Sequence, residues 1–393
     1  MSEIKAILEE LAEVSGNPRK QMEKYLSAGK KVVGCFPVYT PEELVHAGGM
    51  IPMGLWGGQI TPSVAGKYNP IFTCSIMRSC MEYGMTGVYE GLTCAVMPML
   101  CDTFRGMSAA WRSGVKDIPL VSFIHPQNRT DSDAFSFLVE EYRAAAKKLE
   151  EVTGCTITEE SLAQSIEVYN EHSATMMAFA KAANDHLDVI TPVARHAVFK
   201  SALFMEKGEH TEKVKELLSA LEGLPKYEHK GKKVILTGIT AEPDEFLELF
   251  TECGIAVVGD DLAQESRLYR TAIPKRGTAL EDLAGQWFER KGCSMVHEVE
   301  STRGSMLVEM AQAAGAQGIV VCLMRFCDVE EYDYPMIAQS AKEAGLRCLC
   351  LEIDQSTQNN EQSHTKIQSF AEMAESHRQA VMEKRPPPYC LMA

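Results

Sequence analysis

The sequence has no long apolar run. No stretch reaches the ~18 uninterrupted apolar residues that a membrane-spanning helix needs, so we expect no transmembrane segment. The first residues, MSEIKAILEELAEVSG, are amphipathic and acidic, and they lack the basic flank and compact apolar block of a signal peptide. We therefore expect a cytoplasmic protein.

Basic charge is also scarce. The chain of 393 residues has 39 Lys and Arg against 54 Asp and Glu, a net charge of −15. Nucleic acids and anionic membrane surfaces attract basic patches, so this balance argues against both as partners. A small anionic ligand stays compatible with it, provided that local Lys, Arg or helix N-termini receive the charge.

The common nucleotide-binding motifs are missing. No Gly-Lys-Ser/Thr occurs anywhere, and the glycine-rich stretch GGMIPMGLWGG (48–58) matches neither a P-loop nor a dinucleotide fingerprint. These glycines are better explained by a tight turn or a close approach of the backbone to a neighbour.

Paired cysteine motifs are absent too, although cysteine itself is abundant. The 13 cysteines include no C-x-x-C-x-x-C of a ferredoxin and no paired C-x-x-C of a zinc ribbon. An odd number in a long chain without a secretory signal argues against a disulfide framework and predicts reduced thiols. Metal or iron–sulfur chemistry becomes a candidate function, although most of these cysteines should be core residues.

Short apolar runs alternate with helical patterns in two parts of the chain. Eight runs have the length and composition of buried strands: VVGCFPV, IPMGLWG, CAVMPML, IPLVSFI, KKVILTGI, IAVVGDD, GIVVCLM and RCLCLEI. The pattern predicts an α/β protein with two Rossmann-like parallel-sheet domains and a helical segment between them. The expected boundaries are residues 1–155 for N-terminal helices and the first domain, 156–230 for the helical segment, and 231–393 for the second domain with a C-terminal helix.

Three cysteines stand where strands end or helices begin. Cys74 follows NPIFT and opens a Met-rich helical pattern, Cys101 closes CAVMPML, and Cys327 closes GIVVCLM. Ligands of open parallel sheets collect beyond the carboxyl ends of the strands, and a helix N-terminus favours the thiolate that binds metal. Three such thiols, meeting between the domains, would suit zinc or an iron–sulfur cluster with one open position. A packed strand-end thiol is the alternative.

The remaining chemical candidates have weaker patterns. Cys80 and Cys322 are expected in the core, and Cys348 and Cys350 on one face of a buried strand. In GDDLAQESR (259–267), Glu265 and Arg267 are candidate catalytic residues, with Arg267 suited to a phosphate or carboxylate. The alternative there is a solvated helix start, and His125 is expected to be structural.

Taken together, several segments resemble a known family. They are GCFPVYTPEELVHAGGMIPMGLWG, FTCSIM, PMLCDTFRGMS, HPQNR, RHAVFK, DDLAQESR, MRFCDVEEYDYP and LEIDQ. The chain resembles, nearly end to end, the β subunits of the (R)-2-hydroxyacyl-CoA dehydratases, which are related to benzoyl-CoA reductase subunits. HPQNR, RHAVFK and LAQESR are most similar to the lactoyl-CoA branch of that family, with the 2-hydroxyglutaryl-CoA branch next.

The resemblance implies a ligand set. The family's three cluster cysteines fall on Cys74, Cys101 and Cys327, which would hold a [4Fe–4S] cluster with a non-cysteine fourth ligand. This chain has Val329 where the family commonly has proline and Arg325 where it commonly has lysine. Neither change removes a ligand, although the turn after Cys327 becomes less rigid.

The resemblance also implies an activity and partners. The activity is radical dehydration of a 2-hydroxyacyl-CoA to a 2-enoyl-CoA, such as lactoyl-CoA to acryloyl-CoA, without net redox change. The implied partners are an α subunit, in a heterodimer, and an ATP-dependent iron–sulfur activator protein. The β cluster would relay electrons, and a bound flavin is left open.

Two other functions compete with this hypothesis. A benzoyl-CoA reductase-type subunit would use the same cluster to reduce an aromatic acyl-CoA. A non-catalytic scaffold with packed thiols would hold no iron.

Overall fold

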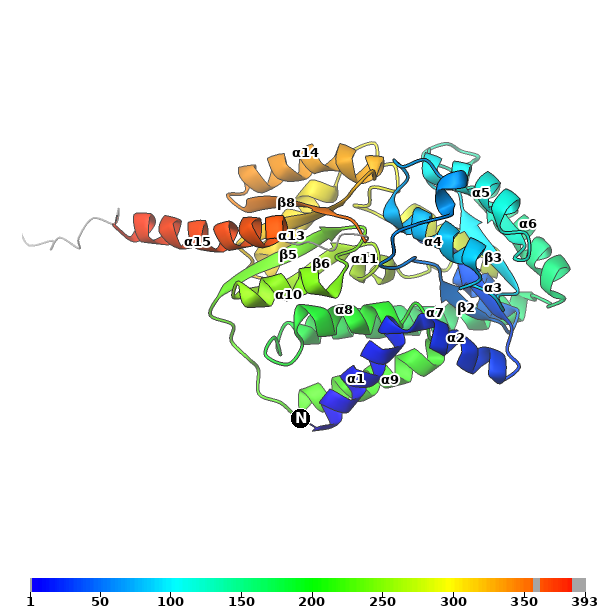
Figure 1. Ribbon diagram of the computed structural model, residues 1–393, viewed down its shortest axis with the longest axis horizontal. Coiled ribbons are helices and arrows are strands. Elements are labelled where there is room, and N and C mark those ends of the chain that lie inside the picture. The colour runs from blue at the N-terminus through cyan, green and yellow to red at the C-terminus, as the bar shows by residue number, and fades with distance from the viewer. Residues whose placement is uncertain (1, 356–360, 384–393) are drawn as a thin grey trace, which may run out of the picture.

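A computed structural model describes residues 2–355 and 361–383, the side chains of 373–383 aside. Within them the chain forms two four-stranded, all-parallel sheets (Figure 1). The first contains β1 (Val32–Cys35), β2 (Ile51–Gly54), β3 (Cys94–Pro98) and β4 (Leu120–Phe123). The second contains β5 (Lys232–Gly238), β6 (Ile255–Leu262), β7 (Gly318–Met324) and β8 (Arg347–Ile353). The predicted α/β class with two Rossmann-like sheets is therefore confirmed.

Both sheets have the same strand order. The first runs β2-β1-β3-β4 and the second runs β6-β5-β7-β8. The order reverses between the two central strands of each sheet, and in open α/β sheets the crevice at such a switch point is the usual place for a ligand. Cys101 follows β3 and Cys327 follows β7, so each lies at one of these crevices.

Helices cover the sheets and fill the space between them. In the first part of the chain these are α1 (Ser2–Gly16), α2 (Pro18–Ser27), α3 (Glu42–Ala47), the short 3-10 helix η1 (Ala65–Lys67), α4 (Ser75–Thr86), α5 (Asp102–Gly114) and α6 (Ala134–Thr153). Three further helices precede the second sheet: α7 (Glu159–Ala183), α8 (Pro192–Ser201) and α9 (Lys207–Glu222). Figure 1 shows α7, α8 and α9 lying together beneath both sheets, with α1 packed against them.

The second sheet carries α10 (Asp244–Glu252), α11 (Ser266–Tyr269), α12 (Ala279–Glu289), α13 (Arg303–Ala313), α14 (Asp328–Glu343) and α15 (Glu361–Glu383). Among these, α12 packs against α6 and α7, and its Trp287 joins the apolar core of the first sheet. Trp287 also donates its indole N–H to the carbonyl of Pro126 at 3.0 Å. The two sheets therefore share packing, and the three-zone boundaries of the sequence stay a prediction.

The glycines of 48–58 allow a close backbone approach, as expected. Gly57 has φ +71°, and a Cβ there would lie 1.8 Å from the Ser79 hydroxyl oxygen of α4. The neighbouring carbonyl of Trp56 accepts a hydrogen bond of 3.0 Å from the Gln355 side chain. A residue with a side chain would separate these segments, so the stretch serves packing between the two halves.

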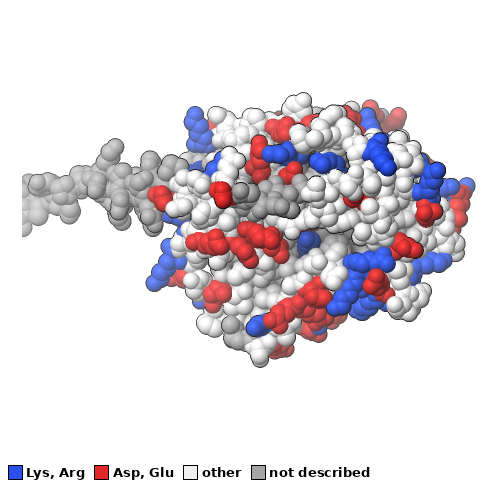
Figure 2. Space-filling model, viewed as in Figure 1, with Lys and Arg blue, Asp and Glu red and all other residues white. Residues whose placement is uncertain are grey.

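The surface agrees with the acidic composition. Figure 2 shows acidic side chains over α1 and α10 and a smaller basic group beside α2 on the same face. Among the described residues, no helix combines the length and the apolar character needed to cross a bilayer.

Candidate functional site

Each of the three cysteines singled out in the sequence lies at the start of a helix. Cys74 is the N-cap residue of α4, Cys101 of α5 and Cys327 of α14. Phe326, with φ +63°, turns the chain between the end of β7 and Cys327. The free N–H groups of a helix's first turn favour negative charge, so each thiol is placed where a thiolate is stabilised.

The three cysteines line one cavity of about 430 Å³. Cys74 and Cys101 come from the first sheet's side and Cys327 from the second, so neither half of the chain forms the cavity alone. Its other walls are largely apolar and include Val38, Met77, Leu100, Phe104, Ile239, Met295, Met324, Phe326 and Val329. The three cysteines thus share one cavity between the sheets, and their role as cluster ligands stays a prediction.

Burial keeps these thiols protonated in the absence of a cation. Burial, with a smaller contribution from the neighbouring Cys101, raises the pKa of Cys74 to about 12. The pKa of Cys327 is raised well above its ordinary value by burial, then by Glu330 and by Cys74. The thiols raise one another's pKa because they lie close together. A positive charge in the cavity would lower these pKa values and favour the thiolates.

Within the described part of the chain, no group of three or more Cys, His, Asp or Glu side chains could hold a metal ion. A cuboidal iron–sulfur cluster requires ligands that lie farther apart than those of a single metal ion, because each thiolate binds a different iron at a separate corner. Three thiols on the walls of a 430 Å³ apolar cavity fit that donor chemistry.

A buried ionic network holds the first turn of α14, which begins beside Cys327. The Glu330 carboxylate accepts hydrogen bonds from Arg267 (3.1 Å), Arg303 (2.8 Å) and the Ser294 hydroxyl (2.6 Å). Its backbone N–H donates to the Cys327 carbonyl at 3.0 Å. Burial raises the pKa of Glu330, but Arg303 and Arg267 outweigh it and hold the pKa below its ordinary value. Glu330 is therefore a charged anchor for the Cys327 turn.

Arg267 belongs to this network and does not line the cysteine cavity. Besides Glu330 it binds Asp261, with Nη2 to Oδ2 at 2.9 Å, and both residues are fully buried. Its donors are thus committed within the protein, which leaves little capacity for a substrate carboxylate. The sequence alternative of a solvated helix start at 259–267 is wrong, because the carboxylates of this stretch pair with Arg residues in the interior.

Glu265 lies in a second buried cluster. It accepts a hydrogen bond of 2.8 Å from Nδ1 of His196, and Asp260 beside it pairs with Arg195 at 2.5 Å. Lys200 and His196 also pair with Glu242. These contacts join α8 to the second sheet. Neither Glu265 nor Arg267 reaches the cysteine cavity, so their role as catalytic residues stays a prediction without geometric support.

The other cysteines lie elsewhere. Cys80 and Cys322 are fully buried, as expected, and the Cys80 thiol donates to the Leu55 carbonyl at 3.1 Å. Cys348 and Cys350 are only partly buried, because β8 is an edge strand, so the expectation of a fully buried face is wrong for them. His125 is buried and bonds the Tyr142 hydroxyl at 3.0 Å, in agreement with a structural role.

Sequence reasoning missed two contributors to this region. Glu330 stands three residues after Cys327, and that spacing alone placed it in the first helical turn without revealing its partners. Gln127, from the HPQNR segment, lines the cavity and donates to the Leu100 carbonyl at 3.0 Å, next to Cys101. Its signal was the polar stretch directly after a buried strand.

Comparisons with known proteins match one family over almost the whole length of this chain. A family model described as 2-hydroxyglutaryl-CoA dehydratase, D-component, matches residues 37–374. Lactoyl-CoA dehydratase subunit beta of Anaerotignum propionicum is 43% identical over 376 residues, 95% of this chain and 100% of the relative.

Two further relatives are similarly complete. The (R)-phenyllactyl-CoA dehydratase beta subunit of Clostridium sporogenes is 39% identical, over 95% of this chain and 100% of its own. The (R)-2-hydroxyglutaryl-CoA dehydratase subunit beta of Acidaminococcus fermentans is 35% identical, over 94% of this chain and 99% of its own. The chain therefore belongs to the 2-hydroxyglutaryl-CoA dehydratase D-component family.

Proposed function

We propose that this chain is the β subunit of an (R)-2-hydroxyacyl-CoA dehydratase, and that Cys74, Cys101 and Cys327 hold a [4Fe–4S] cluster. The enzyme would be a hydro-lyase that converts lactoyl-CoA to acryloyl-CoA and water, in a heterodimer with an α subunit. A 2-hydroxyglutaryl-CoA preference is the alternative within the family.

One observation carries the cluster assignment. Three thiols, distant in sequence and each at a helix N-terminus, line one apolar cavity between two sheets. Packed structural thiols have no reason to share a cavity in this way, as Cys80 and Cys322 illustrate by their separate burial.

When bound, a [4Fe–4S] cluster supplies one-electron transfer at low potential. The three thiols would each release a proton from sulfur on binding, because the thiolate is the ligand form. Their raised pKa values make this loss unfavourable unless positive charge lies close to the sulfurs, which a bound cluster's iron would provide.

The remaining walls have two tasks. Val38, Met77, Met295 and Met324 present apolar surface to the cavity that the sulfurs share. Lowering the local polarity in this way is one of the means by which a protein sets a cluster's potential. Glu330 keeps the Cys327 turn in place through its ion pairs on the side away from the cavity.

Electrons and substrate would be provided by partners. The low-potential electron would come from an ATP-dependent iron–sulfur activator protein, which agrees with the lack of a phosphate-binding motif in this chain. The α subunit would hold most of the acyl-CoA pocket. The relatives are named for lactoyl-CoA, phenyllactyl-CoA and 2-hydroxyglutaryl-CoA, so any of these three acyl groups is a candidate substrate.

The function is tested by an anaerobic assay with the α subunit, the activator, ATP and lactoyl-CoA, following acryloyl-CoA formation. We expect turnover with the native chain, a loss of at least 100-fold for Cys101→Ala, and near-native turnover for the matched control Cys348→Ala. Reduction of benzoyl-CoA in place of lactoyl-CoA dehydration would favour a reductase subunit. Equal turnover for both cysteine variants would contradict the ligand assignment.

A further inference from the structure

A second, smaller cavity of about 70 Å³ lies on the other side of the Pro37–Val38 segment from the cysteines, since both residues line both cavities. Its lining comes from the segment after β1 and from α3, α6, α7, α9, α11 and α12. Most of it is apolar or aromatic, with a few charged groups among them. None of these charged groups takes part in the proposed function.

Arg290 is the unusual residue of this cavity. Its side chain is 5% exposed, its guanidinium lies over the Tyr39 ring at 3.8 Å, and one terminal nitrogen donates to Gln286 at 2.9 Å. The other terminal nitrogen has no hydrogen-bond partner among the described residues, and the nearest carboxyl that acts on the guanidinium, that of Glu43, makes no hydrogen bond to it. A buried guanidinium without a counterion is costly, so the site favours an incoming anion.

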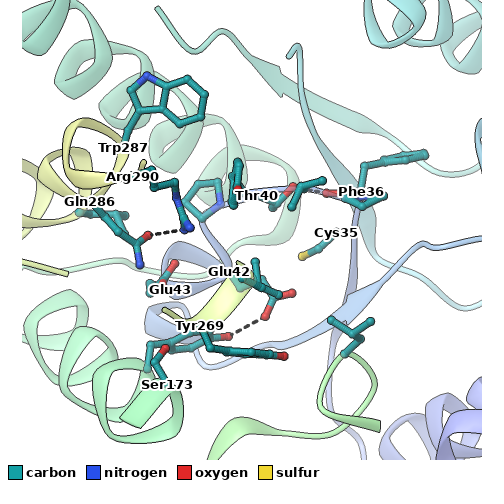
Figure 3. A pocket seen from close by; sticks show the side chains of 18 of the residues that line it. Cys35, Phe36, Thr40, Glu42, Glu43, Ser173, Tyr269, Gln286, Trp287 and Arg290 are labelled. Carbon is teal, nitrogen blue, oxygen red and sulfur yellow. Dashed lines mark hydrogen bonds between the residues drawn. The ribbon is translucent and has the colours of Figure 1, made fainter. Parts of the chain in front are cut away.

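The nearby acidic residues do not neutralise it. Glu42 is already paired with the buried Lys207, at 2.9 Å. Figure 3 shows the Arg290 guanidinium pointing toward the Glu43 side chain. Burial, with a smaller contribution from Glu42, raises the pKa of Glu43 to about 7, although Arg290 acts to lower it. Below neutral pH the Glu43 carboxyl is therefore mostly uncharged, and the charge of Arg290 remains.

The volume limits the ligand. An apolar protein cavity of about 150 Å³ holds benzene, so about 70 Å³ accommodates roughly three or four heavy atoms. One end of the site offers free guanidinium N–H groups, which match a carboxylate. The lining also includes Trp56, Leu203 and Leu283, which suit a short apolar group.

We propose that this cavity binds a small monocarboxylate of formate or acetate size, with its carboxylate on Arg290 and its apolar end against the aliphatic and aromatic walls. The site is separate from the cysteine cavity, and its occupancy does not depend on the dehydratase assignment. It would let the chain respond to the concentration of a short-chain acid.

The test is a ligand-observed NMR titration of the full chain at pH 6 with acetate. Acetamide, which has the same shape without the charge, serves as the charge control, and butyrate as the size control. We expect acetate to bind and both controls to fail. Binding should be lost in Arg290→Gln and kept in Arg143→Gln, which removes an exposed arginine. Equal binding of acetate and acetamide, or unchanged binding in Arg290→Gln, would overturn the proposal.

A pH series tests the site without relying on Arg290→Gln to fold. Glu43 faces Glu42 on its own helix and charged or titratable groups from four neighbouring elements: Tyr142, Tyr169, Lys207 and Arg290. Ionised Glu43 would compete for Arg290, so acetate should bind about tenfold more weakly at pH 8 than at pH 6. Glu43→Gln should bind equally at both values. No acetate binding to either protein at pH 6 would refute the site.

Discussion

At the scale of single residues, position decides what each cysteine can do. Cys74, Cys101 and Cys327 open helices at one cavity, while Cys80 and Cys322 are sealed in apolar cores. The sequence predicted this division because apolar runs mark strands and polar residues mark their ends. Glu330 could not be predicted in the same way, since its partner Arg267 lies 63 residues earlier.

The anchoring role of Glu330 leads to a stability prediction. Glu330→Gln removes the charge that faces two fully buried arginines, and breaking a buried pair in this way costs about 3 kcal/mol or more. We expect urea denaturation to show this decrease in the free energy of unfolding.

The control is Glu331→Gln, one position along the same helix turn and exposed to solvent. It should change the free energy of unfolding by less than about 0.5 kcal/mol. A similar, small effect of both substitutions would mean that the network around Glu330 does not hold the Cys327 turn.

At the scale of elements, the sequence predicted all eight strands, because each contains a short run of apolar residues, although the edge strand β8 is only partly buried. The order of strands within a sheet and the packing of α12 against the first half depend on contacts between distant segments, which local patterns do not carry. α14 continues through Pro335, a residue that usually ends a helix. The ionic contacts of α8 were also hidden, although RHAVFK supplies their charges.

The contacts of α8 predict a pH dependence. Burial lowers the pKa of His196, but its interactions with the Glu242 and Glu265 carboxylates outweigh burial and raise the pKa to about 9. A raised folded-state pKa gives stability that is fully present below about pH 6.5 and is lost as the pH rises through 9.

The native free energy of unfolding should therefore fall by about 3 kcal/mol more than that of His196→Gln between pH 6 and pH 10. Parallel pH profiles for the two proteins in urea denaturation would show that His196 is not charged in the folded state.

At the scale of the whole molecule, the two sheets depend on each other at the cysteine cavity, because each half provides only part of its wall. A ligand bound by both halves stabilises the folded state but not the unfolded chain. Removal of iron from the anaerobically prepared protein with a chelator should lower the Tm by several degrees. The same treatment should leave the Tm of Cys101→Ala unchanged, and an equal shift in that variant would contradict the cavity as the origin of the effect.

The most direct measurement of the central claim is the iron and sulfide content of the anaerobically purified chain. If Cys74, Cys101 and Cys327 hold one cuboidal cluster, the protein should be brown and contain about four iron and four sulfide per chain. A colourless protein without iron or sulfide, after reconstitution under anaerobic conditions, would contradict it.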